Sequence, residues 1–269
     1  MKIRMNDADV FVGQGGVAWE AGRRTLLLQH GAGMNRTVWV LLARYLARHG
    51  FNLVCADLPA HGASGGEALT SIESQADFIW QLLDELQANH ALPAEPVILG
   101  GHSMGALIAT EAAGQQPQRV EQLLLFGSGF PMPVAQPLLD AAAANEQTAV
   151  DMITIYGHCL KSQLGHNPVA GISVQNTAMA MLEGCAPGVL HADLSACNAY
   201  QGLDAAAAAF GQGKATLIAG AEDRMTPMKM SRNLVEQLGG ELVVLADCGH
   251  MVMSEQPEQT LQAARRALS

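Results

Sequence analysis

Charged residues are scarce in this sequence, and basic residues are the scarcer kind. Only 15% of the 269 residues are charged, while 49% are hydrophobic. This composition excludes a disordered chain and predicts a compact globular protein. Fifteen Lys and Arg residues against 25 Asp and Glu residues give a formal net charge of −10. That balance argues against nucleic acid or an anionic membrane surface as a partner.

The sequence also lacks long apolar runs. The stretch from Met1 to Asp7 has no apolar core, so we expect no signal peptide. No segment approaches the length of a membrane span, and we therefore predict no membrane insertion.

Cysteine is sparse, and its spacing suggests no pairing. The five cysteines are scattered and form no Cys-x-x-Cys pair (Cys55, Cys159, Cys185, Cys197 and Cys248). We interpret them as reduced thiols of a cytoplasmic protein. The nine histidines and five cysteines show no ligand spacing either, so we predict no metal site. We also expect no cofactor, because the serine chemistry predicted below needs none.

Short apolar runs alternate regularly with helical patterns along most of the chain. Continuous runs of about five apolar residues are typical of parallel strands that are covered on both faces. Six such runs occupy residues 25–29, 52–56, 96–99, 123–126, 215–219 and 241–245. Residues 2–12 and 16–20 indicate an antiparallel pair at the edge. The predicted fold class is α/β, with a mostly parallel, doubly wound sheet of about eight strands.

Helical segments lie between these runs. Thr70 and Glu73 are spaced as a capping box and predict a helix to about Ala88 with one apolar stripe. Further helices are expected at about 38–50, at 228–239 and from 257 onward.

The alternation stops between Phe130 and Phe210. This stretch contains no strand-like run and is rich in alanine and methionine. It predicts several short helices inserted between two strands. We therefore expect a core of residues 1–130 and 211–269 and a helical cap, or lid, of residues 131–210.

The most informative motif is Gly101-His102-Ser103-Met104-Gly105. It follows one apolar run and precedes the helix-forming run 106–113, which is the strand–turn–helix context of a nucleophile elbow. The two glycines leave room for a sharp turn in which Ser103 adopts a strained backbone. The helix N-terminus behind the turn supplies N–H groups and partial positive charge for an oxyanion. Ser103 is the candidate nucleophile.

A serine nucleophile needs a base, and the base needs an acid that orients it. Two loops at strand ends supply Asp223 and His250. The order Ser103, Asp223, His250 is the chain order that this triad takes on an α/β sheet. Glu222 and Asp247 are alternative acids. Glu222 would point elsewhere from the same turn, and Asp247 is close enough to His250 to shape its loop, so Asp223 is preferred.

Together these residues resemble the α/β-hydrolase superfamily, in its capped, esterase- and lipase-like group, over almost the whole chain. His30-Gly31-Ala32-Gly33 is similar to the oxyanion loop of that family. Residues 57–64, Asp-Leu-Pro-Ala-His-Gly-Ala-Ser, are similar to its Asp-x-Pro-Gly-His-Gly-x-Ser loop, with Ala60 where glycine is usual. Gly249-His250-Met251 matches the motif of the catalytic histidine. The resemblance implies an oxyanion hole made by the backbone N–H groups of Ala32 and Met104.

Other histidines and several methionines remain to be assigned. We expect His102 to pack beneath the elbow, and His30 and His61 to form hydrogen bonds that shape their loops. Methionine is an adaptable filler, and many methionines gather near the predicted site. The candidate lining of an accommodating apolar pocket consists of Met34, Met179, Met181 and Met251.

The sequence therefore predicts a serine hydrolase of carboxylesterase type, which cleaves a small, largely apolar ester or related acyl compound through an acyl-enzyme. Carbon–carbon bond hydrolases, thioesterases, lactonases and cofactor-free perhydrolases use the same triad. Carbon–carbon hydrolases of the superfamily often carry Asn before the serine and Trp after the histidine, where this chain has His102 and Met251. A ligand-binding receptor on the same fold is the non-enzymatic alternative.

Overall fold

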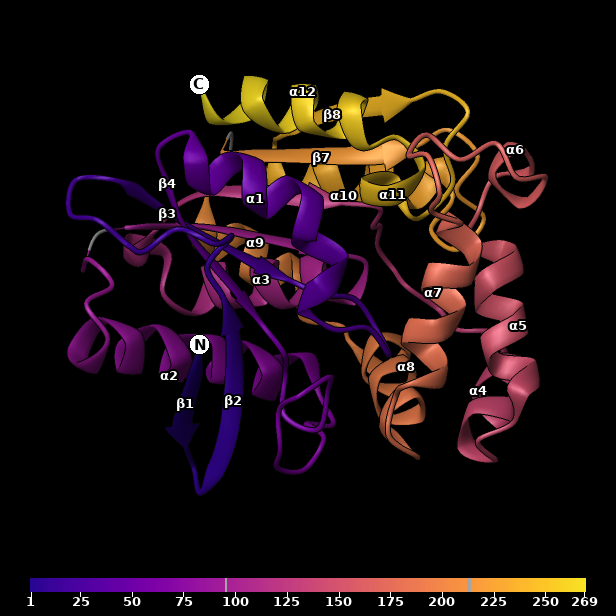
Figure 1. Cartoon of the computed structure of the whole chain (residues 1–269), viewed down its shortest axis with the longest axis horizontal. Coiled ribbons are helices and arrows are strands. Elements are labelled where there is room, and N and C mark those ends of the chain that lie inside the picture. Colours follow the sequence, from indigo (N-terminus) through magenta and orange to yellow (C-terminus); the bar gives the residue numbers. More distant parts are fainter. Residues whose placement is uncertain (95, 212–213) are drawn as a thin grey trace.

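An eight-stranded sheet runs through the computed structural model, which describes residues 1–94, 96–211 and 214–269 (Figure 1). The strands are β1 (Lys2–Met5), β2 (Ala8–Gly13), β3 (Arg24–Gln29), β4 (Phe51–Ala56), β5 (Val97–His102), β6 (Val120–Phe126), β7 (Ala215–Gly220) and β8 (Glu241–Leu245). Their order is β1-β2-β4-β3-β5-β6-β7-β8. All neighbours from β4 to β8 are parallel, and β1–β2 and β2–β4 are antiparallel. The predicted fold class is confirmed.

The antiparallel edge differs from the sequence prediction. The first apolar stretch is not one strand but a hairpin, because Asn6 and Asp7 adopt positive φ values of 46° and 59° and turn the chain back. Met5 then pairs with Ala8. A two-residue turn of this kind matches the twist of the strands that it joins. Residues 16–20, expected as the second edge strand, contain no strand.

Helices cover both faces of the sheet, which explains the continuous apolar runs. On one face lie α1 (Val40–Arg48) and α12 (Pro257–Leu268), and on the other lie α2 (Ile72–Asn89), α3 (Met104–Gln115), α9 (Leu203–Phe210) and α10 (Met228–Leu238). Successive strand residues alternate between them: Leu26 and Leu28 pack with α1, whereas Leu27 packs with α2 and α3. Short elements complete this part of the chain: the 3₁₀ turns η1 (Arg36–Trp39) and η2 (Pro117–Arg119), and the helix α11 (Val252–Glu255).

Helix α2 begins one residue later than predicted. Its N-cap is Ser71, which has an extended backbone, and not Thr70. The Ser74 N–H donates to Ser71 Oγ at 3.1 Å, and the Ser71 N–H donates to Ser74 Oγ at 3.3 Å, so serine replaces Glu73 in the capping box. The predicted apolar stripe is buried against the core (Ile72, Ala76, Ile79, Leu82, Leu83 and Leu86).

The segment between β6 and β7 is helical, as predicted. Ahead of α9 it holds α4 (Gln136–Ala143), α5 (Gln147–Tyr156), α6 (Leu160–Gln163), α7 (Val174–Glu183) and α8 (Val189–Ala199). Figure 1 shows α4–α8 beyond the carboxyl ends of the central strands, and α4, α5, α7 and α8 share an apolar cluster. Helix α9 returns to the sheet and packs against α3. The division into residues 1–130 and 211–269 and residues 131–210 stays a prediction.

Candidate active site

Ser103 occupies a sharp turn between β5 and α3. Its backbone has φ 54° and ψ −117°, a region that a residue with a side chain rarely adopts. The turn needs the glycines on both sides, because a Cβ at Gly101 would overlap the Gly105 carbonyl and a Cβ at Gly105 would overlap the Gln29 carbonyl. The strained turn that the motif predicts is therefore present.

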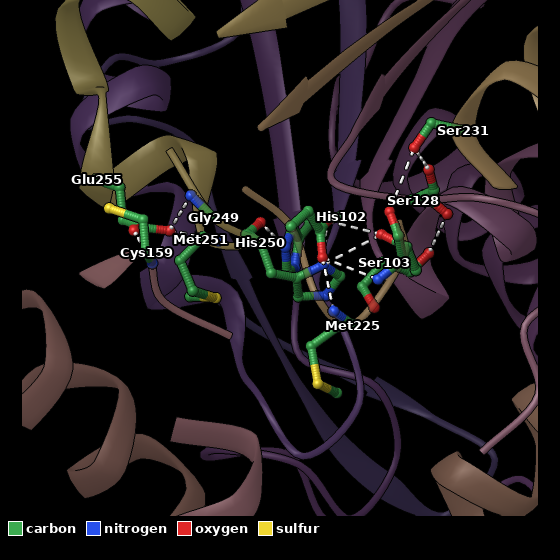
Figure 2. Close-up of polar contacts among 12 residues, drawn as sticks. His102, Ser103, Ser128, Cys159, Met225, Ser231, Gly249, His250, Met251 and Glu255 are labelled. Carbon is green, nitrogen blue, oxygen red and sulfur yellow. Dashed lines mark hydrogen bonds and ion pairs between the residues drawn. The ribbon is translucent and has the colours of Figure 1, made fainter. Parts of the chain in front are cut away.

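Serine hydroxyls hold the Ser103 backbone from the neighbouring elements. Ser128 Oγ donates to the Ser103 carbonyl at 3.1 Å, and Ser231 Oγ donates to the Ser128 carbonyl at 2.8 Å (Figure 2). Ser231 comes from α10, so a chain of two hydrogen bonds links this helix to the turn. The sequence analysis missed both residues, and neither lies in a recognisable motif.

His250 and Asp223 meet at the ends of the adjacent strands β8 and β7. His250 Nδ1 donates to Asp223 Oδ2 at 2.8 Å. The N–H groups of Met225 and Thr226 each donate to Asp223 Oδ1 at 2.8 Å, and Thr226 Oγ1 donates to Oδ2 at 2.7 Å. Burial raises the pKa of Asp223, but the charge of His250 and these hydrogen bonds outweigh burial and bring the pKa below its ordinary value. The carboxylate is ionised and fixes the proton on Nδ1, which leaves Nε2 as the basic ring nitrogen.

The two alternative acids lie elsewhere. Glu222 is exposed to solvent. Asp247 is also exposed, and its Oδ2 forms an ion pair with Lys161 Nζ at 2.9 Å. Asp223 is the carboxylate hydrogen-bonded to His250.

A buried carboxylate that the sequence analysis missed fixes the His250 loop. Glu255 Oε1 accepts hydrogen bonds from the N–H groups of Gly249 and Met251, at 3.0 and 3.1 Å (Figure 2). Its Oε2 accepts from the N–H of Cys159 at 2.8 Å. Glu255 thus joins the loop to the segment between α5 and α6.

His102 lies beneath the elbow, as predicted. Its Nε2 donates to the His250 carbonyl at 3.0 Å, and the two rings are 4.6 Å apart. Complete burial, with a smaller contribution from the charge of His250, lowers the pKa of His102 to about 3. The ring is therefore neutral.

Met104 directly follows Ser103 in the chain, and Ala32 borders the same cavity as Ser103. Met104 opens α3, where the first N–H groups of a helix have no partner within the helix. Within residues 1–94, 96–211 and 214–269, neither the Ala32 N–H nor the Met104 N–H donates a hydrogen bond. The oxyanion hole implied by the resemblance stays a prediction.

His30 and His61 shape the loops behind Ala32, as predicted. The Leu58 N–H donates to His30 Nε2 at 3.2 Å, and His30 Nδ1 donates to the Gly31 carbonyl at 2.9 Å. His61 Nδ1 donates to the Pro59 carbonyl at 2.9 Å.

Asp193, on α8, connects these loops to the inserted helices. Its Oδ2 accepts from the Gly33 N–H and from His61 Nε2, each at 2.8 Å. Burial lowers the pKa of His61, but the hydrogen bond to Asp193 and the charge of Asp193 together raise the pKa by more than burial lowers it. The net shift of the pKa is therefore upward. The sequence analysis missed Asp193, although its helical spacing from the buried Leu190 and Cys197 indicated the buried face of α8.

A cavity of about 300 Å³ opens in front of Ser103 and His250. Its volume lies at the lower end of the range for ligand pockets. The loops of the core contribute Ala32, Met34, Arg224, Met225 and Thr226, among others. The inserted helices and the chain leading to them contribute mostly apolar side chains, among them Met132, Val134, Leu138, Met152, Ile153, Tyr156 and Leu194.

Among the described residues that border this cavity is Met34, but not Met179, Met181 or Met251, and which residues bind the substrate stays a prediction. Met179 and Met181 lie on α7, which packs against α5, and it is α5 that faces the cavity. Met251 is buried and is not among the residues that border the cavity. Met132, Met152 and Met225 take their place.

Two features are absent from the described part of the chain. No helix in it is both long enough and apolar enough to cross a bilayer. No three His, Cys, Asp or Glu side chains within it are grouped as metal ligands.

Comparison with known proteins agrees with this geometry. Residues 26–263 match the Alpha/beta hydrolase family. The chain belongs to that family. One alpha/beta hydrolase relative is the pimeloyl-[acyl-carrier protein] methyl ester esterase of Aromatoleum aromaticum, 30% identical over 255 residues that cover 88% of this chain and 94% of the relative. Another is the (E)-2-((N-methylformamido)methylene)succinate hydrolase of Acinetobacter baylyi, 24% identical over 249 residues and 88% of each chain.

Solved structures share the alpha/beta hydrolase fold of this chain. The enol-lactonase from Burkholderia xenovorans has a TM-score of 0.83 at 17% identity and covers 100% of this chain and 99% of its own. A thermophilic esterase from Thermogutta terrifontis has a TM-score of 0.82 at 21% identity, with coverage of 100% and 97%.

Proposed function

We propose that this alpha/beta hydrolase is a serine esterase that cleaves a small, largely apolar carboxylic ester through an acyl-enzyme. The observation that carries the proposal is one cavity bordered by the strained Ser103 and by His250, whose other ring nitrogen is bound to an ionised Asp223. The related methyl ester esterase, at 30% identity over most of both chains, also supports ester cleavage.

In the proposed mechanism, His250 Nε2 removes the Ser103 hydroxyl proton while Oγ attacks the ester carbonyl carbon. Asp223 stabilises the imidazolium that forms. The N–H groups of Ala32 and Met104 donate to the oxyanion, and a single such donor is worth about 100- to 1000-fold in rate. When the carbon–oxygen bond to the alcohol breaks, His250 returns the proton to the leaving oxygen. Water, activated by His250, then hydrolyses the acyl-enzyme.

We also propose that residues 131–210 form the cap of this site. Support comes from the position of α4–α8 beyond the carboxyl ends of the strands, and from the apolar side chains that α4, α5 and α8 contribute to the cavity. A cytoplasmic location belongs to the same proposal and is based on the scattered, unpaired cysteines.

The first test is turnover of a short-chain aryl ester by the wild type, Ser103→Ala and His250→Ala. Because nucleophile and base act as a unit, we expect each variant to lose about 10⁴-fold or more of kcat, with non-additive effects in the double variant. Ser195→Ala, on α8, is the control and should keep its activity. Hydrolysis that persists in Ser103→Ala would refute the serine mechanism, and binding without turnover in the wild type would favour a ligand receptor.

Thioesters, lactones and carbon–carbon bonds are the alternative substrates of the same triad. A lactone stays an alternative substrate because the chain shares its fold with an enol-lactonase. Carbon–carbon bond cleavage is less favoured because His102 and Met251 replace the Asn and Trp often found in carbon–carbon hydrolases. Parallel assays with a thioester and a lactone of equal chain length rank these reactions by kcat/KM.

A further inference from the structure

Arg224 differs from every other residue around the cavity. It is the one Lys, Arg, Asp or Glu side chain among the lining residues of the described chain, and most of its companions are apolar. It directly follows Asp223 in the loop after β7 and is itself exposed, so its guanidinium stands at the solvent side of the cavity. A positive charge therefore stands at the entrance of a mostly apolar pocket.

The contacts of Arg224 hold its guanidinium in place without neutralising it. Nη2 donates to the Ile155 carbonyl at the end of α5, and the guanidinium carbon lies 5.1 Å from the centre of the Tyr156 ring. Within the described residues, no carboxylate lies within ion-pair distance of Arg224. Because a guanidinium has five N–H donors in a rigid fork, the remaining donors are free for a ligand.

A purely structural role explains these contacts less well. Glu255 already joins the segment between α5 and α6 to the core, and the Lys161–Asp247 ion pair joins α6 to it. A further link would not require an unpaired charge beside the cavity. In a chain with a formal net charge of −10, Arg224 instead supplies local positive charge where a ligand enters.

We infer that the substrate carries a carboxylate, which Arg224 binds at the mouth of the cavity while the apolar part of the molecule fills the space in front of Ser103. The inference rests on the proposed esterase function and names its substrate class: small esters with an anionic end. Carboxylate is the group that the planar fork of an arginine matches with two parallel hydrogen bonds.

The test compares matched charged and neutral esters. One pair is the para-nitrophenyl half-ester of adipic acid and para-nitrophenyl hexanoate, which places the carboxylate on the acyl side. The other pair is the acetate ester of a hydroxybutanoate and butyl acetate, which places it on the alcohol side. The readout is the ratio of kcat/KM for the charged and the neutral ester, measured in the wild type, Arg224→Gln and Arg224→Lys.

We expect the wild type to favour the charged ester in at least one pair. Arg224→Gln should lower the charged-to-neutral ratio about 10-fold or more, in the range of a hydrogen bond to a charged group, mainly through KM. Arg224→Lys, which keeps the charge but loses the fork, should fall between the two. Added salt should reduce the preference of the wild type, because the site is open to solvent.

Lys161→Gln is the matched control, since it removes a neighbouring positive charge that does not line the cavity, and it should leave the ratio unchanged. An equal loss on both esters in Arg224→Gln would mean that Arg224 only supports the structure, and a wild-type ratio of one in both pairs would also overturn the inference. Hydrolysis of neither ester would refute the esterase function itself, so the two failures are distinguishable.

Discussion

Ala60 has a backbone that suits glycine better. It has φ +66°, a left-handed value, at the position where related loops usually carry glycine. The loop keeps its fold because the Ala60 N–H donates to the Gly65 carbonyl at 3.0 Å, and because the Asp57 side chain accepts from the Ala63 N–H at 3.0 Å. The alanine therefore strains the folded state.

We predict that Ala60→Gly stabilises the protein by about 0.5–1 kcal/mol. The left-handed conformation costs a residue with a side chain about 1–2 kcal/mol, and the larger entropy of unfolded glycine offsets about 0.5–1 kcal/mol of the gain. Urea unfolding measures the difference. Ala63→Gly, three residues on at an ordinary φ, is the control and should destabilise; a loss of stability in Ala60→Gly would contradict the strain.

Between elements, the most consequential polar contact is the one that joins α8 to the loops beneath it. Asp193 and His61 are fully buried, and their charges face Asp57 and the His30 ring, whose centre lies 4.9 Å from that of His61. Removing one partner of such a buried pair strongly destabilises the folded protein, because the other charge is left buried without a partner. The strength of the pair must follow the protonation of His61.

We predict that the stability gained from His61 declines at alkaline pH. Because the pKa of His61 is raised above 6.5 in the folded state, folding favours the protonated ring. The contribution is complete below pH 6.5 and is lost as the pH rises through the folded-state value, by up to about 1.4 kcal/mol per pH unit. The measurement is the difference in unfolding free energy between the wild type and His61→Gln, followed from below pH 6.5 to alkaline pH.

The exposed His166 provides the control for that measurement. The unfolding free energy of His166→Gln should differ little from that of the wild type, and this difference should not decline with rising pH as it does for His61→Gln. A wild-type advantage over His61→Gln that is constant with pH, or that grows toward alkaline pH, would rule out the charged pair.

At the scale of the whole molecule, the sheet carries the candidate reacting groups and the inserted helices set the space in front of them. Met152, on α5, lines the cavity, whereas Met179, on α7, does not. Burial of each methylene is worth about 0.8 kcal/mol, so kcat/KM should rise about fourfold per added acyl carbon until the cavity is full.

We predict that Met152→Ala moves the optimum of the acyl-chain series to longer esters, because it enlarges the cavity. Met179→Ala is the control and should not move the optimum. A series of para-nitrophenyl esters gives both profiles. No dependence on chain length, or the same shift in both variants, would contradict this view of the cavity.

The strand ends that carry Ser103, Asp223 and His250 could be predicted because parallel strands bring their carboxyl ends to one edge. Local patterns could not predict the lining, because which methionines face the cavity depends on how α5 and α7 pack on each other. The buried carboxylates of Asp193 and Glu255 were missed because a charge on a helix ordinarily faces solvent. The one-residue shift of the α2 cap has a local origin, since both Thr70 and Ser71 can cap a helix.

The contact between Asp193 and the Gly33 N–H has a consequence for engineering. A chimera made to change selectivity would take α4–α8 from another family member. The exchange also replaces α8, the helix that carries Asp193. Unless the graft brings an acid to the position of Asp193, the amide beside Ala32 and the ring of His61 lose their acceptor together. A graft of the inserted helices therefore also changes the contacts of the loop that holds Ala32, and a donor for recombination is best chosen first by that one carboxylate.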